Sequence, residues 1–269
     1  TGVQTCALPI SGFHDRPLAG VVYGSGVEQH DDVLEVVRRH WPLMGNDPEV
    51  VRTCKDPSLF FPLLARLGIP SPQTMLAPPA GQTPGVWLRK HAGGAGGGHI
   101  RVVRDNEQSQ AGVYFQKLLY GRVLSLTCLA DSHDAAILGV NETWAQAPEH
   151  FDFRYAGACT VNDLPGPDAA TLQHIFHTLV RATGLKGLCG MDVIEDAHGH
   201  YQVLEINPRP TATFELYQER DSLFAAHVQA SQGHLDYHVH IHRTQYLKAA
   251  YALDMASYLG STQIGRAHV

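Results

Sequence analysis

The chain has 269 residues, a net charge of -6, 44% hydrophobic residues and only 17% charged residues. No stretch approaches the roughly 18 consecutive apolar residues that a membrane-spanning helix needs, and the acidic balance argues against a nucleic-acid surface. The 26 glycines favour a loop-rich α/β enzyme over a helical bundle. None of the five cysteines forms a C-x-x-C pair, which excludes a zinc ribbon and indicates reduced thiols in a cytoplasmic protein.

Both ends of the chain differ in character from the rest. Residues 1–11 lack the charged and apolar regions of a signal peptide. Codons for residues 264–269 can be chosen so that their reverse complement encodes most of residues 4–10, and this DNA resembles a sequencing-library adaptor. We therefore expect residues 1–11 and 264–269 to be adaptor scars on a fragment that is cut at both ends.

The first half of the chain predicts a small α/β unit followed by a helix. Residues 18–23 form an apolar run that ends in a glycine turn, which is typical of a buried strand. Asp31 or Asp32 can cap a helix that continues to about Arg39. A second helix is expected from Pro57 to Gly68, before a proline-rich connector.

The second half predicts more strands than helices, and we assign the fold to the α+β class. A helix is expected over 168–183 and another over 223–232, followed by a short histidine-rich strand. A tight turn at 195–199 should join the last two long strands into a hairpin. The expected strands are 86–90, 100–103, 113–118, 125–130, 136–140, 190–194 and 201–206.

The predicted hairpin carries the most informative group of polar residues, Asp192 followed by Glu205, Asn207 and Arg209. Residues two apart in a strand share a face, and Asp192 can lie opposite Glu205 on the partner strand. Two carboxylates and an amide oxygen suit Mg²⁺, which prefers oxygen ligands, and Arg209 can bind an anion with two hydrogen bonds. The alternative is a charged sheet surface without a ligand.

A second group lies where the strand 86–90 runs into a glycine-rich loop. Lys90 can add a positive charge next to a loop whose backbone N–H groups can approach phosphate oxygens. The loop is neither a Walker A motif nor a G-x-G-x-x-G fingerprint, and a flexible hairpin tip is the alternative. Arg89 should face away from Lys90, at the surface. The loop glycines are Gly93, Gly94, Gly96, Gly97 and Gly98.

Other residues are weaker candidates. A lysine such as Lys55, expected just before a helix, is usually solvated. Arg154 could hold a substrate carboxylate, or could be a surface arginine in a loop between strands. Asn141, Glu142 and Trp144 could line the site of a second substrate.

The C-terminal region adds one further pattern. His238, His240 and His242 should share one strand face, where they could bind a transition metal or form the polar side of an edge strand. Cys159 and Cys189 are interpreted as buried apolar thiols.

These pieces occur together and in order in the ATP-grasp superfamily, which the sequence resembles over residues 55–217. Lys55 looks like the family's first nucleotide-binding lysine, and Lys90 with the glycine loop resembles the second lysine and the phosphate-covering loop. The strand ending in Gln116, Lys117 and Leu118 is similar to the hinge whose backbone contacts adenine. Lys117 stands where many members have an acidic residue.

The hairpin with its E-I-N-P-R-P segment resembles the magnesium-binding strands, most closely those of a carbamoyl-phosphate-synthase-like or tyramine–glutamate-ligase-like group. The resemblance implies an ATP-grasp fold of two α+β subdomains that clasp ATP. It places this domain at 51–232, after a truncated N-terminal α/β lobe at 12–50 and before a truncated segment at 233–263.

The resemblance also implies an activity. ATP and Mg²⁺, or Mn²⁺ in its place, would activate a carboxylate as an acyl phosphate for attack by an amine. Lys55 and Lys90 would hold phosphates, Asp192, Glu205 and Asn207 the metal, and Arg209 the transferring phosphoryl group. Small-molecule substrates are expected as partners, without nucleic acid or membrane, and homo-oligomer formation stays open. The alternatives are a small-molecule kinase and an inactive ATP-binding fragment.

Overall fold

A computed structural model describes residues 19–79, 83–162, 164–217, 220–235 and 247–249. The proposed adaptor scars and the histidines at 238, 240 and 242 lie outside these residues. Within the described part of the chain, no helix is both long and apolar enough to cross a membrane.

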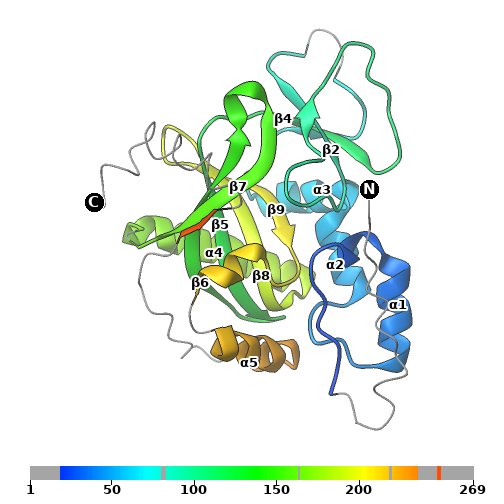
Figure 1. Cartoon of the computed structure of the whole chain (residues 1–269), viewed down its shortest axis with the longest axis vertical. Coiled ribbons are helices and arrows are strands. Elements are labelled where there is room, and N and C mark those ends of the chain that lie inside the picture. Colours follow the sequence, from blue (N-terminus) through cyan, green and yellow to red (C-terminus); the bar gives the residue numbers. More distant parts are fainter. Residues whose placement is uncertain (1–18, 80–82, 163, 218–219, 236–246, 250–269) are drawn as a thin grey trace.

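Two antiparallel sheets dominate the structure (Figure 1). The small sheet has the strand order β1-β4-β2-β3, and the large sheet has the order β10-β7-β6-β5-β8-β9. The small sheet is formed by β1 (Thr74–Met75), β2 (Trp87–His91), β3 (Arg101–Val102) and β4 (Val113–Lys117). The large sheet is formed by β5 (Arg122–Asp131), β6 (Ala135–Ala147), β7 (Asp152–Val161), β8 (Lys186–Glu195), β9 (Tyr201–Asn207) and β10 (Leu247–Ala249).

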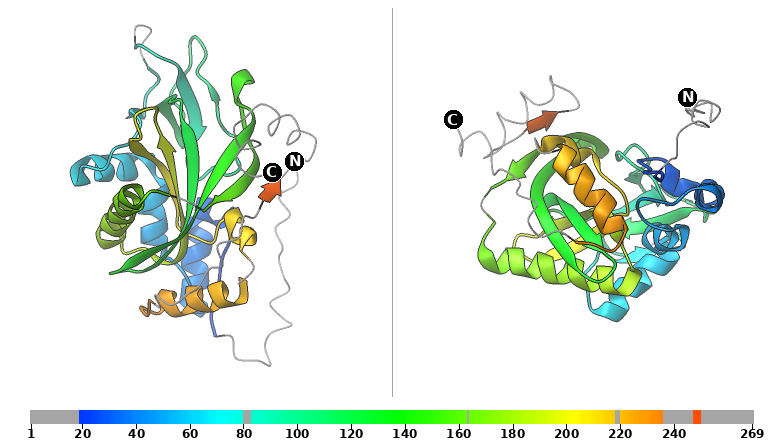
Figure 2. Two further views of the ribbon diagram at one scale, coloured as in Figure 1. Left: turned by 90° about the vertical axis from the view of Figure 1, so that its left-hand side faces the viewer. Right: turned by 90° about the horizontal axis from the view of Figure 1, so that it is seen from below.

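Helices cover both faces of the large sheet (Figure 2). Successive residues of a strand point to opposite faces, so Leu126 packs with Phe176 of α4, whereas Leu129 packs with Leu223 of α5. The α-helices are α1 (Asp31–His40), α2 (Pro48–Lys55), α3 (Pro57–Leu67), α4 (Gly166–Thr183) and α5 (Arg220–Ser231). Short 3-10 turns within the described residues are η2 (Val27–Gln29), η3 (Pro148–His150) and η4 (Ala212–Leu216).

The N-terminal lobe is a short α/β unit, as predicted, although its first strand is reduced to a parallel bridge between Val21 and Leu43 on either side of α1. Asn46, almost completely buried, fixes the lobe to the large sheet. Its amide donates to the carbonyls of Lys186 and Pro208, both at 2.9 Å, and accepts from the Lys186 N–H at 2.7 Å. The lobe is therefore attached next to the end of β9.

The predicted α+β class is confirmed, with three local corrections. Residues 152–161 form the long strand β7, so Arg154 lies in a strand and not in a loop. Lys55 precedes a helix as predicted, but it also ends the unpredicted helix α2, and its side chain is only 7% exposed instead of solvated. Asp56 alone separates α2 from α3, and it caps α3 by accepting from the Ser58 N–H at 2.8 Å. Arg89 is largely buried and not at the surface, because it contacts Glu107 and Gln110 of the segment between β3 and β4.

Candidate active site

The β8–β9 hairpin has the predicted register. Asp192 is paired directly with Glu205, and Gly190 with Asn207. The Asn207 amide donates to Asp192 Oδ2 at 3.2 Å, so the three polar residues lie on one face. Met191 is completely buried on the opposite face, in the core with α4. The hairpin therefore brings two carboxylates and an amide together.

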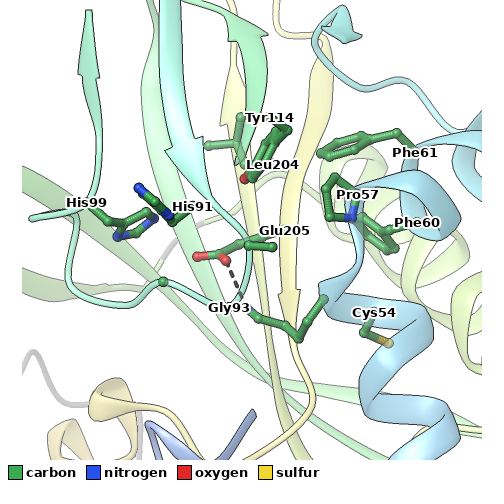
Figure 3. Close-up of a pocket in the computed structure, with 13 residues that line it drawn as sticks. Cys54, Pro57, Phe60, Phe61, His91, Gly93, His99, Tyr114, Leu204 and Glu205 are labelled. Carbon is green, nitrogen blue, oxygen red and sulfur yellow. Dashed lines mark hydrogen bonds and ion pairs between the residues drawn. The ribbon is translucent and has the colours of Figure 1, made fainter. Parts of the chain in front are cut away.

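A β-bulge changes the direction of the β9 side chains at this point. The register shifts between Asp192 and Val193, so Val203 is the next paired residue after Glu205. As a result, Leu204 and Glu205 both line a cavity, although they are neighbours in a strand (Figure 3). Bulges re-aim side chains next to active sites in many proteins.

Lys55 contacts the predicted metal ligands themselves. Its Nζ lies 3.1 Å from Glu205 Oε2, 3.1 Å from Asn207 Oδ1 and 3.3 Å from the Ile206 carbonyl oxygen. The Lys55 ammonium therefore forms an ion pair with the carboxylate of Glu205, which Figure 3 labels. Placement at the end of α2 explains this reach, because the helix packs against β9. The ammonium thus stands where the ligand oxygens converge.

The ionisation of this corner follows from burial and charge. Burial and the neighbouring Glu205 carboxylate raise the pKa of Asp192. Burial acts in the same direction on Glu205, but the charge and hydrogen bond of Lys55 outweigh it and lower the pKa of Glu205. Burial lowers the pKa of Lys55, and the charges of Glu205 and Glu28 more than offset this, so its pKa is raised. Glu205 is therefore paired with a contacting ammonium, whereas Lys55 acts on Asp192 without outweighing the effects that raise its pKa.

These residues fit a hard divalent cation. Asp192 Oδ1 is buried without a hydrogen-bond partner, which leaves one oxygen available to a cation. Among the described residues, no group of three or more His, Cys, Asp or Glu could hold a metal ion. The two carboxylates and the Asn207 amide are an oxygen set that suits Mg²⁺ with water and phosphate as further ligands.

Lys90 faces this corner from the small sheet. Its Nζ donates to Gln116 Oε1 at 2.7 Å, and the Gln116 amide donates to Thr74 Oγ1 at 3.1 Å. Burial lowers the pKa of Lys90, and the nearby charges of Glu205 and Asp192 oppose this effect. Tyr114, paired with Lys90 across β2 and β4, lines the same cavity as Glu205. The two sheets therefore present opposite charges to each other.

The glycine loop lies between these walls and is attached at two points. The Gly93 carbonyl accepts from Gln29 Nε2 at 2.8 Å, and the Gly96 carbonyl accepts from the Tyr155 N–H at 3.0 Å. Gly97 has φ of 75°, and a Cβ there would lie 1.9 Å from the Phe153 carbonyl oxygen. Only glycine fits this close approach to β7. Gly93 and Gly94 line the cavity, whereas no described cavity includes Gly96, Gly97 or Gly98.

Arg209 lies two residues after the end of β9 and is buried. Its Nε lies 2.8 Å from Glu28 Oε1, and its Nη1 donates to the Pro210 carbonyl oxygen at 3.1 Å. The positive charge of Arg209 acts on Lys55, which places the guanidinium near the cation corner. The structure therefore brings Arg209 to the site, although the Glu28 carboxylate of the N-terminal lobe already pairs with it.

The segment predicted to contact adenine has a different environment from the one expected. Gln116 lies inside the small sheet, paired with Leu88 on one side and Thr74 on the other. The Leu118 N–H donates to the Val86 carbonyl oxygen at 2.8 Å, and the Lys117 N–H donates to the backbone carbonyl oxygen of Gln73 at 2.9 Å. These N–H groups are engaged in the sheet, so a purine contact at this segment has to use other atoms.

The weaker candidates lie apart from the cation corner or have structural partners. Arg154 pairs with Asp152 at the outer end of β7. Asn141 is completely buried and donates to the Ser125 carbonyl oxygen at 3.0 Å. Glu142 pairs with Arg122 at 2.8 Å, and Trp144 is buried in the large sheet. Cys189 is buried as predicted, whereas Cys159 is only half-buried.

Sequence reasoning missed Glu28, Gln29, Tyr114 and His99. Tyr114 and His99 line the cavity at Glu205, and His99 Nδ1 is buried without a hydrogen-bond partner (Figure 3). Glu28 and Gln29 lie in an N-terminal turn that is far from the site in sequence. A glutamate next to a glycine turn is a common surface pattern, so the sequence carried little signal for them.

Comparisons with known proteins identify the family and the fold. The family described as "ATP-grasp domain" matches residues 54–213. A search of curated proteins finds no match. Among solved structures, the biotin carboxylase–βγ-ATP complex from Campylobacter jejuni is 16% identical with a TM-score of 0.66, over 82% of this chain and 55% of that chain.

Two further structures show the same fold. The biotin carboxylase domain of Hydrogenobacter thermophilus 2-oxoglutarate carboxylase, in complex with MgADP, ADP and bicarbonate, is 12% identical with a TM-score of 0.67, over 86% of this chain and 58% of that one. The L-amino acid ligase from Bacillus licheniformis is 12% identical with a TM-score of 0.62, over 84% and 59%. The chain thus spans little more than half of these proteins. Because the family match covers more than half of the chain, this protein belongs to the ATP-grasp family.

Proposed function

We propose that the protein is an ATP- and magnesium-dependent ligase that activates a carboxylate as an acyl phosphate for attack by an amine. The observation that carries the proposal is the convergence of Asp192, Glu205 and Asn207 with Lys55 and Lys90 from the facing wall. An ammonium contacts Glu205 and Asn207, the arrangement expected of a site built for cations. MgADP in one solved neighbour and amino acid ligation in another support the choice of cofactors and reaction.

Each residue has a role that follows from its place. Asp192, Glu205 and Asn207 would hold Mg²⁺, or Mn²⁺ in its place, which when bound supplies charge neutralisation for phosphoryl transfer. Lys90, kept in place by Gln116, would bind phosphate oxygens. The Lys55 ammonium would exchange its contacts with Glu205 and Asn207 for contacts with phosphate oxygens. Gly93 and Gly94 would cover the phosphates.

The reaction would then follow in two steps. A carboxylate oxygen of the first substrate forms a bond to the γ-phosphorus, and ADP leaves. The acceptor nitrogen next forms a bond to the acyl carbon, inorganic phosphate leaves, and the nitrogen releases a proton to solvent. Arg209, at the end of β9, would bind the transferring phosphoryl group with the planar fork of its guanidinium.

A screen for ADP release tests the proposal. The purified chain is mixed with Mg²⁺, ATP and pools of carboxylates and amines, offered separately and together. The ligase requires both pools for full turnover, and with a carboxylate alone it yields a hydroxamate when hydroxylamine is added. ADP release that needs one substrate and gives a stable phosphorylated product would instead identify a kinase. ATP binding without ADP release in any pool would identify an inactive fragment.

A further inference from the structure

One short turn of the N-terminal lobe contacts both walls of the site. Within η2, Gln29 Nε2 donates to the Gly93 carbonyl of the glycine loop at 2.8 Å. The preceding residue, Glu28, lies with its Oε1 2.8 Å from Nε of Arg209, which follows β9 of the large sheet. Two successive side chains of one turn therefore hold the phosphate-covering loop and the arginine of the opposite wall.

The turn is itself firmly fixed. Val27 packs against the buried cluster of Tyr23, Leu34 and Val51. The Tyr23 hydroxyl donates to the Asn46 carbonyl at 2.7 Å, and Asn46 is bonded to the large sheet. The turn therefore moves with the large sheet, so the hydrogen bond from Gln29 ties the glycine loop to that body.

The Glu28–Arg209 pair is buried but incompletely hydrogen-bonded. The side chains are 1% and 8% exposed, and neither Glu28 oxygen nor Arg209 Nε makes a well-aligned hydrogen bond. A buried pair of this kind contributes little net stability, because desolvation offsets the attraction. Its clearer effect is on geometry. With Nε held by Glu28 and Nη1 by Pro210, the plane of the guanidinium is fixed.

The position of the turn relates it to the chemistry. Glu28 and Gln29 line a cavity of about 900 Å³ together with Asp32, Lys55 and Gly93. Lys55 and Gly93 also line the cavity at Glu205, so the two spaces meet at the phosphate end of the site. A turn at this junction is well placed to set the distance between the two walls.

We propose that Glu28 and Gln29 are positioning residues, which brace the site by aiming Arg209 and holding the glycine loop. The catalytic meaning of the brace depends on the proposed ligase function, whereas its two contacts can be tested without turnover. In this scheme the N-terminal lobe completes the ATP site as well as covering the large sheet.

Amide hydrogen exchange of the full chain, read by mass spectrometry, tests the two contacts separately. Gln29→Ala should speed exchange in residues 92–99 by about fivefold, the equilibrium effect of one hydrogen bond, and should leave 208–213 unchanged. Glu28→Gln should speed exchange in 208–213 and leave 92–99 unchanged. Glu35→Gln, which changes a carboxylate that pairs with Arg38 within α1, is the matched control and should change neither segment.

Nucleotide affinity gives a second test, in which a variant keeps the size of the Gln29 side chain but loses its hydrogen bond. Gln29→Glu has the same size as glutamine but cannot donate to the Gly93 carbonyl. The affinity for MgADP, measured by calorimetry, should therefore fall by at least as much as in Gln29→Ala. Exchange that rises equally in both segments in both variants, or MgADP affinity that Gln29→Glu retains, would overturn the brace. If the exchange pattern is as expected but the screen shows no ADP release, the ligase function is rejected and the brace is kept.

Discussion

The two walls of the site are built in different ways. On the large sheet, Asp192, Glu205 and Asn207 belong to one hairpin whose strands pair directly at these residues. On the small-sheet side, Lys90 is held by one hydrogen bond, which its ammonium donates to Gln116 Oε1. The adjoining glycine loop is attached through single contacts from Gln29 and Tyr155.

The difference indicates which half of the site is set before nucleotide binds. Metal-binding oxygens on paired strands keep their spacing before a cation or nucleotide binds, as a preorganised cation site requires. The loop can shift at the cost of two hydrogen bonds and Lys90 at the cost of one, so they can adjust to the phosphates. We expect changes in the first wall to abolish function and changes in the second to weaken binding.

The largest effect is expected from Glu205→Gln. The amide keeps the shape of the side chain but removes the charge that pairs with Lys55 and would face the cation. Magnesium-dependent ATP turnover should fall by at least about a hundredfold, as when a transition-state contact is lost, while circular dichroism stays unchanged. Glu195→Gln, three residues beyond Asp192 on β8, is the control. Equal turnover in both variants would remove Glu205 from the metal site.

Lys55→Met should change two affinities in opposite directions. The ammonium contacts Glu205 and Asn207, so it competes with a cation for these oxygens. Without it, Mn²⁺ should bind the nucleotide-free protein more tightly, by about tenfold for a lost charged contact, whereas ADP should bind more weakly. Both affinities can be measured by calorimetry. Lys186→Met, which removes the same charge at the start of β8, should leave both unchanged, and weaker Mn²⁺ binding in Lys55→Met would contradict this account.

A smaller effect is expected from Gln116→Leu in the other wall. The change leaves the ammonium of Lys90 without its 2.7 Å acceptor, and MgADP affinity should fall by roughly tenfold. Gln110→Leu is a close control, because Gln110 accepts from Arg89 at 2.6 Å on the other face of β2. Similar losses in both variants would mean that the small sheet is simply destabilised.

Much of this fold follows from local sequence patterns. The strands from 86 to 118, the hairpin of β8 and β9, and the helix ending at Gly184 all have clear apolar runs and turn residues. The strand β7 was missed because Asp152 and Arg154 look like a polar loop. Their charges pair with each other at an exposed strand end, where such residues cost little.

The site was predictable where it depends on one hairpin and not where it depends on distant segments. The spacing of Asp192, Glu205 and Asn207 gives their common face directly. The position of Lys55 depends on how α2 packs against β9, and that of Glu28 on where the N-terminal lobe docks. These are tertiary contacts, which leave no periodic pattern in the sequence.

The smallest effect concerns the support behind the first wall. His227 of α5 accepts from the Leu188 N–H of β8 at 2.8 Å, and its Nε2 donates to the Met44 carbonyl of the N-terminal lobe at 2.8 Å. This geometry requires the neutral ring, and burial lowers the pKa of His227. The unfolded chain, with a histidine pKa of about 6.5, therefore binds more protons than the folded protein below that pH.

The stability that His227 contributes should be complete above about pH 6.5 and should be lost as the pH falls towards the lower pKa of the folded state. Thermal unfolding from pH 7.5 to 5 should thus show a larger decrease in Tm for the wild type than for His227→Gln, by on the order of 2–4 °C. The glutamine can make both hydrogen bonds without titrating. His174→Gln, exposed on α4, should keep the full pH dependence of the wild type. If His227→Gln keeps it as well, the junction of the N-terminal lobe, α5 and β8 does not limit stability in acid.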